Sequence, residues 1–149
     1  MFHYKGCGLD NVYLANGYER RTTNSGMEVM HIEDMAGLHR TIALTVAVNP
    51  LEIGGAEFRF LRKELDMSQR AIAGVLGVQE QTVSLWERGE QPVPQYAAVL
   101  ICALTREYFS GQAAMKNLID RVCSANLAIA KTKLLIERTD QGSWMQKAA

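Results

Sequence analysis

The chain has 149 residues, which allow one well-packed core or two small ones. An apolar fraction of 48% is ordinary for a globular protein, and the longest apolar runs are too short to span a bilayer. The formal net charge is zero, so the chain as a whole has no basic excess that would attract a nucleic acid. No secretory signal is predicted, and the widely spaced Cys7, Cys102 and Cys123 favour a reducing cytoplasm over a disulfide framework.

Residues 1–50 are predicted to form a small N-terminal α+β unit. Residues 12–18 and 27–32 are rich in β-branched and aromatic side chains, and the intervening Thr-Thr-Asn-Ser-Gly is turn chemistry. This pattern predicts a β-hairpin or a short meander. A helix is then expected from residue 34 or 35 to 46, with Leu38, Ile42 and Thr45 in one inward stripe, before Asn49-Pro50 ends it.

A second unit is predicted over residues 54–109, beginning with a helix at residues 55–66. Phe58, Leu61 and Leu65 recur at i, i+3 and i+7, which is the spacing of an inward stripe. Three basic residues of this helix lie off that stripe and are expected to form a mostly solvated face; they are Arg59, Arg62 and Lys63.

Residues 69–88 predict two short helices joined by a tight turn. Ser68 can cap the first helix through its hydroxyl, and Gly77 can end it because glycine accepts a positive φ. Val83 and Trp86 return the second helix to the same core. Seven positions carry the size and polarity that a helix-turn-helix needs: Ile72, Ala73, Leu76, Gly77, Val78, Val83 and Trp86. The alternative is a helical hairpin that only fills a core.

This stretch resembles the Xre/Cro phage-repressor type of helix-turn-helix, with Ser68-Gln69 opening its second helix and Trp86-Glu87-Arg88-Gly89 closing its third. The resemblance implies a mainly α, lambda-repressor-like DNA-binding domain that binds double-stranded DNA.

A second resemblance covers about two thirds of the chain, from about Tyr4 to about Glu107. CGLDNVYLANGY, EFRFLRKEL, QTV and WERG are similar to segments of the MqsA/YgiT-type regulators, many of which are antitoxins that repress their own operon. Zinc ribbons of this type use paired CxxC motifs. Here Tyr4 occupies the position of the first cysteine before Cys7, and no second pair follows.

Metal binding by the remaining candidates is not expected. His3, Cys7, His31 and His39 have acceptable chemistry, but the spacing of the first two is unusual and nothing in the sequence sets the distance to the others. Surface histidines and a buried thiol are the simpler interpretation. We predict neither a metal nor another cofactor.

After a turn at residues 89–94, Pro94 suits the first turn of a fourth helix that runs to about Phe109. Its predicted inward residues are Ala98, Ile101, Leu104 and Tyr108.

Residues 110–149 are predicted to form a long helix followed by a frayed tail from residue 141. Between residues 112 and 138 there is no proline or glycine, and apolar residues alternate at spacings of three and four. That heptad pattern predicts a dimer interface; the alternative is a helix packed on its own domain. The predicted interface comprises Met115, Leu118, Val122, Ala125, Ile129 and Ile136.

Helical geometry then predicts which side chains face DNA, once Val83 and Trp86 point inward. The predicted DNA-contacting residues are Gln69, Arg70, Gln79, Glu80, Gln81, Thr82, Ser84, Leu85 and Arg88. The glutamines at 79 and 81 suit adenine, Glu80 a cytosine amino group and Leu85 a thymine methyl group. Gln69 and Thr82 suit phosphates. The resemblance implies contacts at Gln69, Glu80, Gln81 and Leu85; the alternative is that these side chains only solvate a helix.

No arrangement typical of an enzyme is present. Two functions therefore remain open: a homodimeric, sequence-specific transcriptional regulator that represses from an inverted-repeat operator, or an antitoxin that neutralises a partner toxin through residues 1–48 and regulates its own operon. Residues 56–92 contain five basic and six acidic residues, so one copy should bind DNA weakly.

Overall fold

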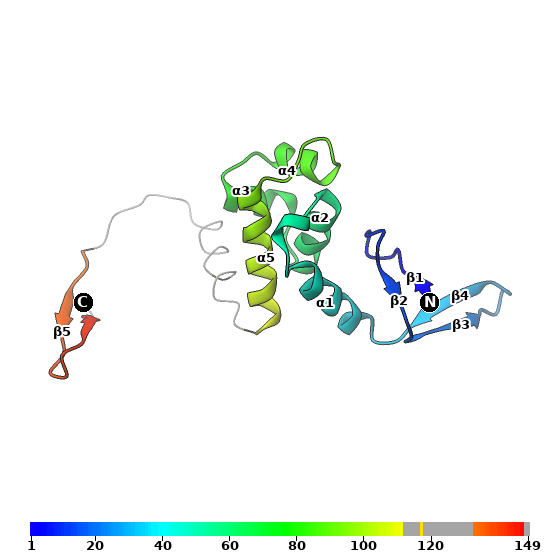
Figure 1. Cartoon of the computed structure of the whole chain (residues 1–149), viewed down its shortest axis with the longest axis horizontal. Helices are drawn as coiled ribbons and strands as arrows, with labels where there is room; N and C mark the ends of the chain where they lie inside the picture. The colour runs from blue at the N-terminus through cyan, green and yellow to red at the C-terminus, as the bar shows by residue number, and fades with distance from the viewer. Residues whose placement is uncertain (112–116, 118–132, 148–149) are drawn as a thin grey trace.

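A computed structural model of the chain describes residues 1–111, 117 and 133–147. Among these residues, five helices follow a small β region (Figure 1). They are α1 (Met35–Val46), α2 (Gly55–Glu64), α3 (Gln69–Leu76), α4 (Glu80–Glu87) and α5 (Gln95–Phe109), with a 3₁₀ turn, η1 (Pro50–Glu52), between the first two. No helix among the described residues is both long enough and apolar enough to cross a membrane.

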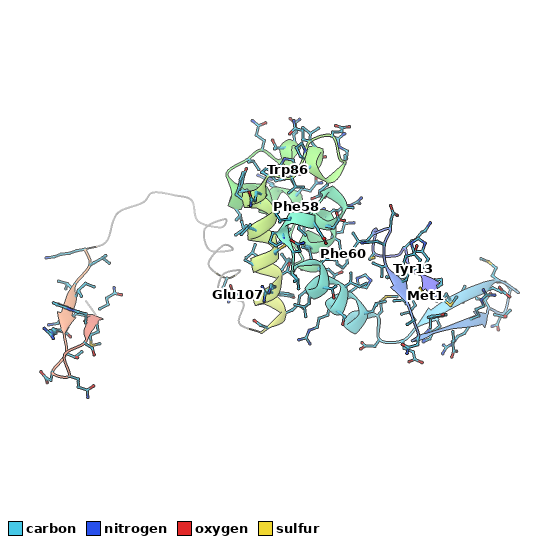
Figure 2. All side chains as sticks on the ribbon, in the orientation of Figure 1. Met1, Tyr13, Phe58, Phe60, Trp86 and Glu107 are labelled. Carbon is cyan, nitrogen blue, oxygen red and sulfur yellow. The ribbon has the colours of Figure 1, made fainter. Side chains whose placement is uncertain are left out.

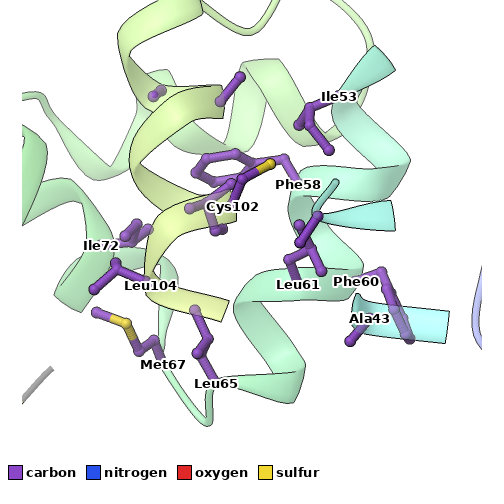
Figure 3. Packing of buried hydrophobic residues seen from close by; sticks show 14 of the residues in the cluster. Ala43, Ile53, Phe58, Phe60, Leu61, Leu65, Met67, Ile72, Cys102 and Leu104 are labelled. Atoms are coloured by element: carbon purple, nitrogen blue, oxygen red, sulfur yellow. The ribbon is translucent and has the colours of Figure 1, made fainter. Parts of the chain in front are cut away.

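Helix α2 lies at the centre of the core, as the spacing of its apolar residues predicts. Phe58, Leu61 and Leu65 are each fully buried. They face α5, which contributes Ile101 and Leu104 to the same cluster (Figure 3). The extent of the predicted fourth helix is also confirmed, since Pro94 occupies the N-cap position of α5 and the helix reaches Phe109. The prediction that Tyr108 faces inward is wrong, because this residue lies in the last turn of α5 and is 37% exposed.

Helix α1 has the predicted ends, and two of its three predicted inward residues face the core, since Ile42 is buried and Leu38 packs against the same cluster. Asp34 caps it by accepting a hydrogen bond from the Gly37 amide. Ala43 and the C-cap residue Ala47 are buried as well, whereas Thr45 is exposed, so the prediction that Thr45 faces inward is wrong. The Thr45 hydroxyl instead donates to the Thr41 carbonyl on the exposed side of the helix, which satisfies its hydrogen bonding without a buried partner.

The helical core continues across the boundary predicted near residue 50. Helix α1 contacts both α2 and α5, and Ala43 of α1 lies beside Phe60 of α2 (Figure 3). Phe60, on the opposite side of α2 from the predicted stripe, is only 4% exposed because α1 covers it. The division into units at residues 50 and 54 stays a prediction.

Residues 1–33 form two small antiparallel pairs. β1 (Phe2–His3) pairs with β2 (Tyr13–Leu14), and β3 (Tyr18–Thr22) pairs with β4 (Glu28–Ile32). The predicted hairpin turn is present, with Gly26 at a φ of 82°. The predicted strand at residues 12–18 is wrong in extent, because Gly17 has a φ of 78° and separates β2 from β3.

The C-terminal residues contradict a helix reaching residue 138. Ile136, predicted in the dimer seam, lies in β5 (Ile136–Arg138), which pairs with β6 (Trp144–Gln146) where a frayed tail was expected. Thr139 and Gly142 close this hairpin, and the φ of 81° at Gly142 makes the reversal possible. The other predicted seam residues, Met115, Leu118, Val122, Ala125 and Ile129, lie outside the described residues.

Candidate nucleic-acid interface

The turn between α3 and α4 is built as the sequence predicts. The Ser68 hydroxyl accepts a hydrogen bond from the Ala71 amide at 3.0 Å and caps α3. Gly77 ends α3 with a φ of 68°, and its amide bonds to the Ala73 carbonyl. These local contacts set the angle at which α4 leaves the turn.

The inner face of α4 packs on the core. Val83 is fully buried and Trp86 is 3% exposed. The Trp86 ring meets Phe58 of α2 edge-on, with ring centroids 5.7 Å apart, and both lie inside the helical part of the molecule (Figure 2). This packing fixes the rotation of α4 about its own axis.

The opposite face and the N-terminal end of α4 are open to solvent. Gln79 occupies the N-cap position but makes no side-chain cap bond. Gln79, Glu80 and Gln81 are all exposed, while Thr82 and Ser84 are half-buried. Exposed polar side chains at the start of a second helix are the arrangement that enters a major groove.

The C-terminal end of the same face carries Leu85 and Arg88. Leu85 is half-buried, and its carbonyl accepts hydrogen bonds from the amides of Glu90 and Gln91, which folds the following loop against the helix. Arg88 is exposed, and its side chain makes long contacts of 3.4 Å to the Ser84 carbonyl and the Glu90 carboxylate. Such contacts hold the guanidinium weakly.

A buried ion pair that the sequence did not predict fixes the end of α4. Two nitrogens of Arg62 on α2 donate to the two carboxylate oxygens of Glu87, each at 2.8 Å. A third nitrogen donates to the Met67 carbonyl at 2.9 Å. The expectation of a solvated Arg62 is therefore wrong: the residue is 8% exposed, because α4 covers this side of α2. Its position four residues after Phe58, at the edge of the apolar stripe, is the only local signal for this burial.

Gln69 joins this ion pair. Its side-chain amide donates to a Glu87 oxygen at 3.1 Å, so the side chain is held in place at the start of α3. Arg70, next in the chain, is exposed. None of the predicted DNA-contacting residues of α3 and α4 is buried in the core, and their contacts with DNA stay a prediction.

Gly55 explains how closely α2 and α4 approach. A Cβ atom at this position would lie 2.1 Å from the Trp86 carbonyl oxygen. Only glycine therefore allows the first turn of α2 to meet the last turn of α4 at this distance.

The candidate metal ligands are not brought together. No group of three or more His, Cys, Asp or Glu suited to a metal ion occurs within residues 1–111 and 133–147. The His3 ring bonds to the Asp10 carbonyl oxygen and stacks on Tyr13. His39 has a different setting and is described next.

Tyr4 links the β region to the helices. Its hydroxyl lies 2.7 Å from His39 Nε2, while His39 Nδ1 donates to Glu64 at 2.7 Å. Burial raises the pKa of the Tyr4 hydroxyl, and the nearby Cys7 and Glu64 raise it further. Tyr4 therefore stays protonated and can donate to the imidazole.

Comparison with known proteins agrees with this geometry. Residues 55–104, about one third of the chain, match a family model described as a helix-turn-helix domain. The match begins at the first residue of α2 and ends within α5, so it covers the surface described above. No curated protein and no solved structure matches the chain.

The fold and this match define a protein with a helix-turn-helix domain. They support DNA binding and transcription regulation, and they agree with a regulator of the Cro/Xre type.

Proposed function

We propose that the protein is a sequence-specific transcriptional repressor of the Xre/Cro type that acts as a homodimer in the cytoplasm. The main observation behind this proposal is the orientation of α4. Val83 and Trp86 anchor one face in the core, while Gln79, Glu80 and Gln81 stand exposed at the leading end.

The exposed side chains of α4 have the chemistry needed to distinguish base pairs. The amides of Gln79 and Gln81 can each pair with adenine through two hydrogen bonds, and Glu80 can accept from the cytosine amino group. The Gln69 side chain, which hydrogen-bonds to Glu87, can contact a phosphate at the edge of the groove. Arg88 lies at the far end of the helix, where it would meet the sugar-phosphate backbone.

Charge supports the homodimer. The helix-turn-helix region has no basic excess, so phosphate contacts by one copy supply little affinity. Two linked copies on an inverted repeat would bind more tightly without any new contact. The proposed dimer contacts are now Met115, Leu118, Val122, Ala125 and Ile129, since Ile136 belongs to a strand.

Base reading by α4 is tested with Gln81→Ala and Arg88→Ala. After selection of a preferred site from random duplexes, each variant is titrated with that site and with a scrambled duplex at several salt concentrations. Gln81→Ala should cost about 1–3 kcal/mol on the preferred site and relax one base position per half-site. Arg88→Ala should weaken both duplexes alike and reduce the salt slope by about one unit. Identical profiles for the two variants would show that α4 does not read bases.

A second function is favoured by the β region. A groove of about 460 Å³ lies between residues 11–16 and α1, with Leu14 and Ile42 on its walls and Asn11 and Thr45 among its polar groups. A partner segment with an apolar side chain could enter it, which fits an antitoxin that binds its toxin through the N-terminal region. Co-expression with the product of the adjacent reading frame tests this function. Copurification that is lost on Ile42→Glu, with DNA binding retained, is the expected result, and no copurification would contradict it.

A further inference from the structure

A second cavity lies along α2. It has a volume of about 320 Å³ and is enclosed by the turn at residues 6–8, by α2 and by His39 of α1. Glu87, at the end of α4, also contributes to the wall. The volume falls at the lower end of the range for small-metabolite sites.

The acidic groups in this wall already have hydrogen-bond partners within the protein. Glu64 accepts a hydrogen bond from His39, and Glu87 accepts two from Arg62 and one from Gln69. Neither carboxylate is therefore available as the main partner of a bound cation.

The basic groups in the wall have no such partners. Arg59 and Lys63 are exposed, and within residues 1–111 and 133–147 neither side chain makes an ion pair or a hydrogen bond. They are four residues apart on α2, so their side chains lie on the same side of the helix and can reach one ligand together. Phe60, Ala56 and Cys7 supply apolar surface beside them.

We propose that this cavity binds a small organic anion, with its carboxylate or phosphate group held between Arg59 and Lys63 and its apolar body against Phe60. An Arg–Lys pair suits either head group, because the guanidinium presents paired donors and the ammonium a compact charge. Because Glu87 joins the cavity wall to the end of α4, the anion acts as an effector of DNA binding. That effector role, but not the site itself, rests on the proposed function.

The reactivity of Cys7 can be used to probe the site, because its half-buried thiol lines the cavity. The full-length protein is labelled with two methanethiosulfonates of opposite charge, 2-sulfonatoethyl and 2-(trimethylammonio)ethyl, and the modification rate of Cys7 is measured by peptide mass spectrometry. The ratio of the modification rate with the anionic reagent to that with the cationic reagent should be about tenfold higher at Cys7 than at a free thiol, because the positive charges of Arg59 and Lys63 attract the first reagent and repel the second. Arg59→Gln/Lys63→Gln should remove most of this preference. A matched pair, Arg20→Gln/Arg106→Gln, makes the same charge change elsewhere on the surface and should leave it intact. A preference equal to that of a free thiol would overturn the proposal.

Binding itself is measured as protection of Cys7 from the neutral reagent iodoacetamide. The probes are benzoate, phenyl phosphate and, as an uncharged control, benzyl alcohol. At least one anion should protect Cys7 saturably, and which of the two does so identifies the head group. Protection should be lost in Arg59→Gln/Lys63→Gln and kept in the matched pair. Protection by neither anion, or equal protection by benzyl alcohol, would overturn the site.

The effector role has its own readout. The protecting anion is added to a titration of the protein with its preferred duplex, and the dissociation constant should change by at least about threefold in the native chain and not in Arg59→Gln/Lys63→Gln. If the anion protects Cys7 but does not change the dissociation constant, the binding site is supported and the effector role is wrong. If the anion protects Cys7 in a protein that binds no duplex, the binding site is supported and the proposed function is wrong.

Discussion

The helical core and the β3–β4 hairpin differ in what stabilises them. In the core, Phe58, Leu61 and Leu65 of one helix are each fully removed from water. In the hairpin, β3 has one half-buried residue and β4 has three, so hydrogen bonds between the paired strands are the main interaction that holds it together. Hydrophobic burial is the dominant favourable contribution to folding, so the same kind of substitution should have very different effects in the two regions.

The largest difference is expected for apolar truncation. Phe58→Ala should lower the free energy of unfolding by about 3–5 kcal/mol, because the ring is fully buried against Trp86. Val29→Ala on β4, where the side chain is 42% exposed, should cost less than about 0.5 kcal/mol. Urea unfolding followed by tryptophan fluorescence and by circular dichroism measures both. Equal losses would mean that the hairpin contributes to the same cooperative core.

Removing an ion pair should also destabilise the helical core much more than the β3–β4 hairpin. Arg62→Met leaves the Glu87 carboxylate, 2% exposed, without its bidentate partner and should cost about 3–5 kcal/mol. Arg21→Met removes an exposed contact with Glu19 on β3 and should not change the urea midpoint measurably. The double variant Arg62→Met/Glu87→Leu is the control, since removing both charges should recover part of the loss. No recovery would indicate that packing, not charge, is responsible.

A smaller difference between the two regions is expected when a glycine with a positive φ is replaced by alanine. Gly77 has a φ of 68° and Gly26 a φ of 82°, and a Cβ would meet no atom within 4 Å at either position. Gly77→Ala should cost about 1–2 kcal/mol, because a side chain disfavours this conformation at a joint of the core. Gly26→Ala should leave the urea midpoint unchanged and speed amide exchange only in β3 and β4. A midpoint shift for Gly26→Ala would place the hairpin within the globally cooperative unit.

The smallest effects should appear in the dependence on pH. Burial raises the pKa of the Cys102 thiol above its ordinary value of 9.0, with Arg106 acting in the opposite direction. A raised folded-state pKa gives stability that is complete below the unfolded-state value and is lost as the pH rises above it. Between pH 8 and pH 10 the native chain should therefore lose more stability than Cys102→Ala, as measured by urea midpoints. Parallel curves for the two proteins would contradict this.

The hairpin should respond at the other end of the pH scale. The hydrogen bond from Arg21 and its positive charge hold the pKa of Glu19 below its ordinary range. This contribution is present above the unfolded-state pKa and is lost as the pH falls through the lower folded-state value. Amide exchange in β3 and β4, not the global unfolding midpoint, should report it.

Much of the helix-turn-helix could be predicted because its signals are local. The ends of α1 and α5, the stripe of α2 and the caps at Ser68 and Gly77 follow from spacing and backbone preference. The β parts were predicted less well. Short strands give few residues of alternation, and the strand of Ile136 carried an apolar spacing that also fits a helix.

The sequence by itself determined where the chain turns between α3 and α4, and it determined the apolar stripes of α2 and α4 that enter the core. It could do so because helix periodicity, capping and positive φ depend on residues within one or two turns of each other. The tertiary structure alone decided that Arg62 is buried with Glu87, that Gln69 is held at the start of α3, and that Tyr4 reaches His39. These pairs join residues 18 to 35 positions apart, so their energy depends on how the helices pack and not on any local pattern.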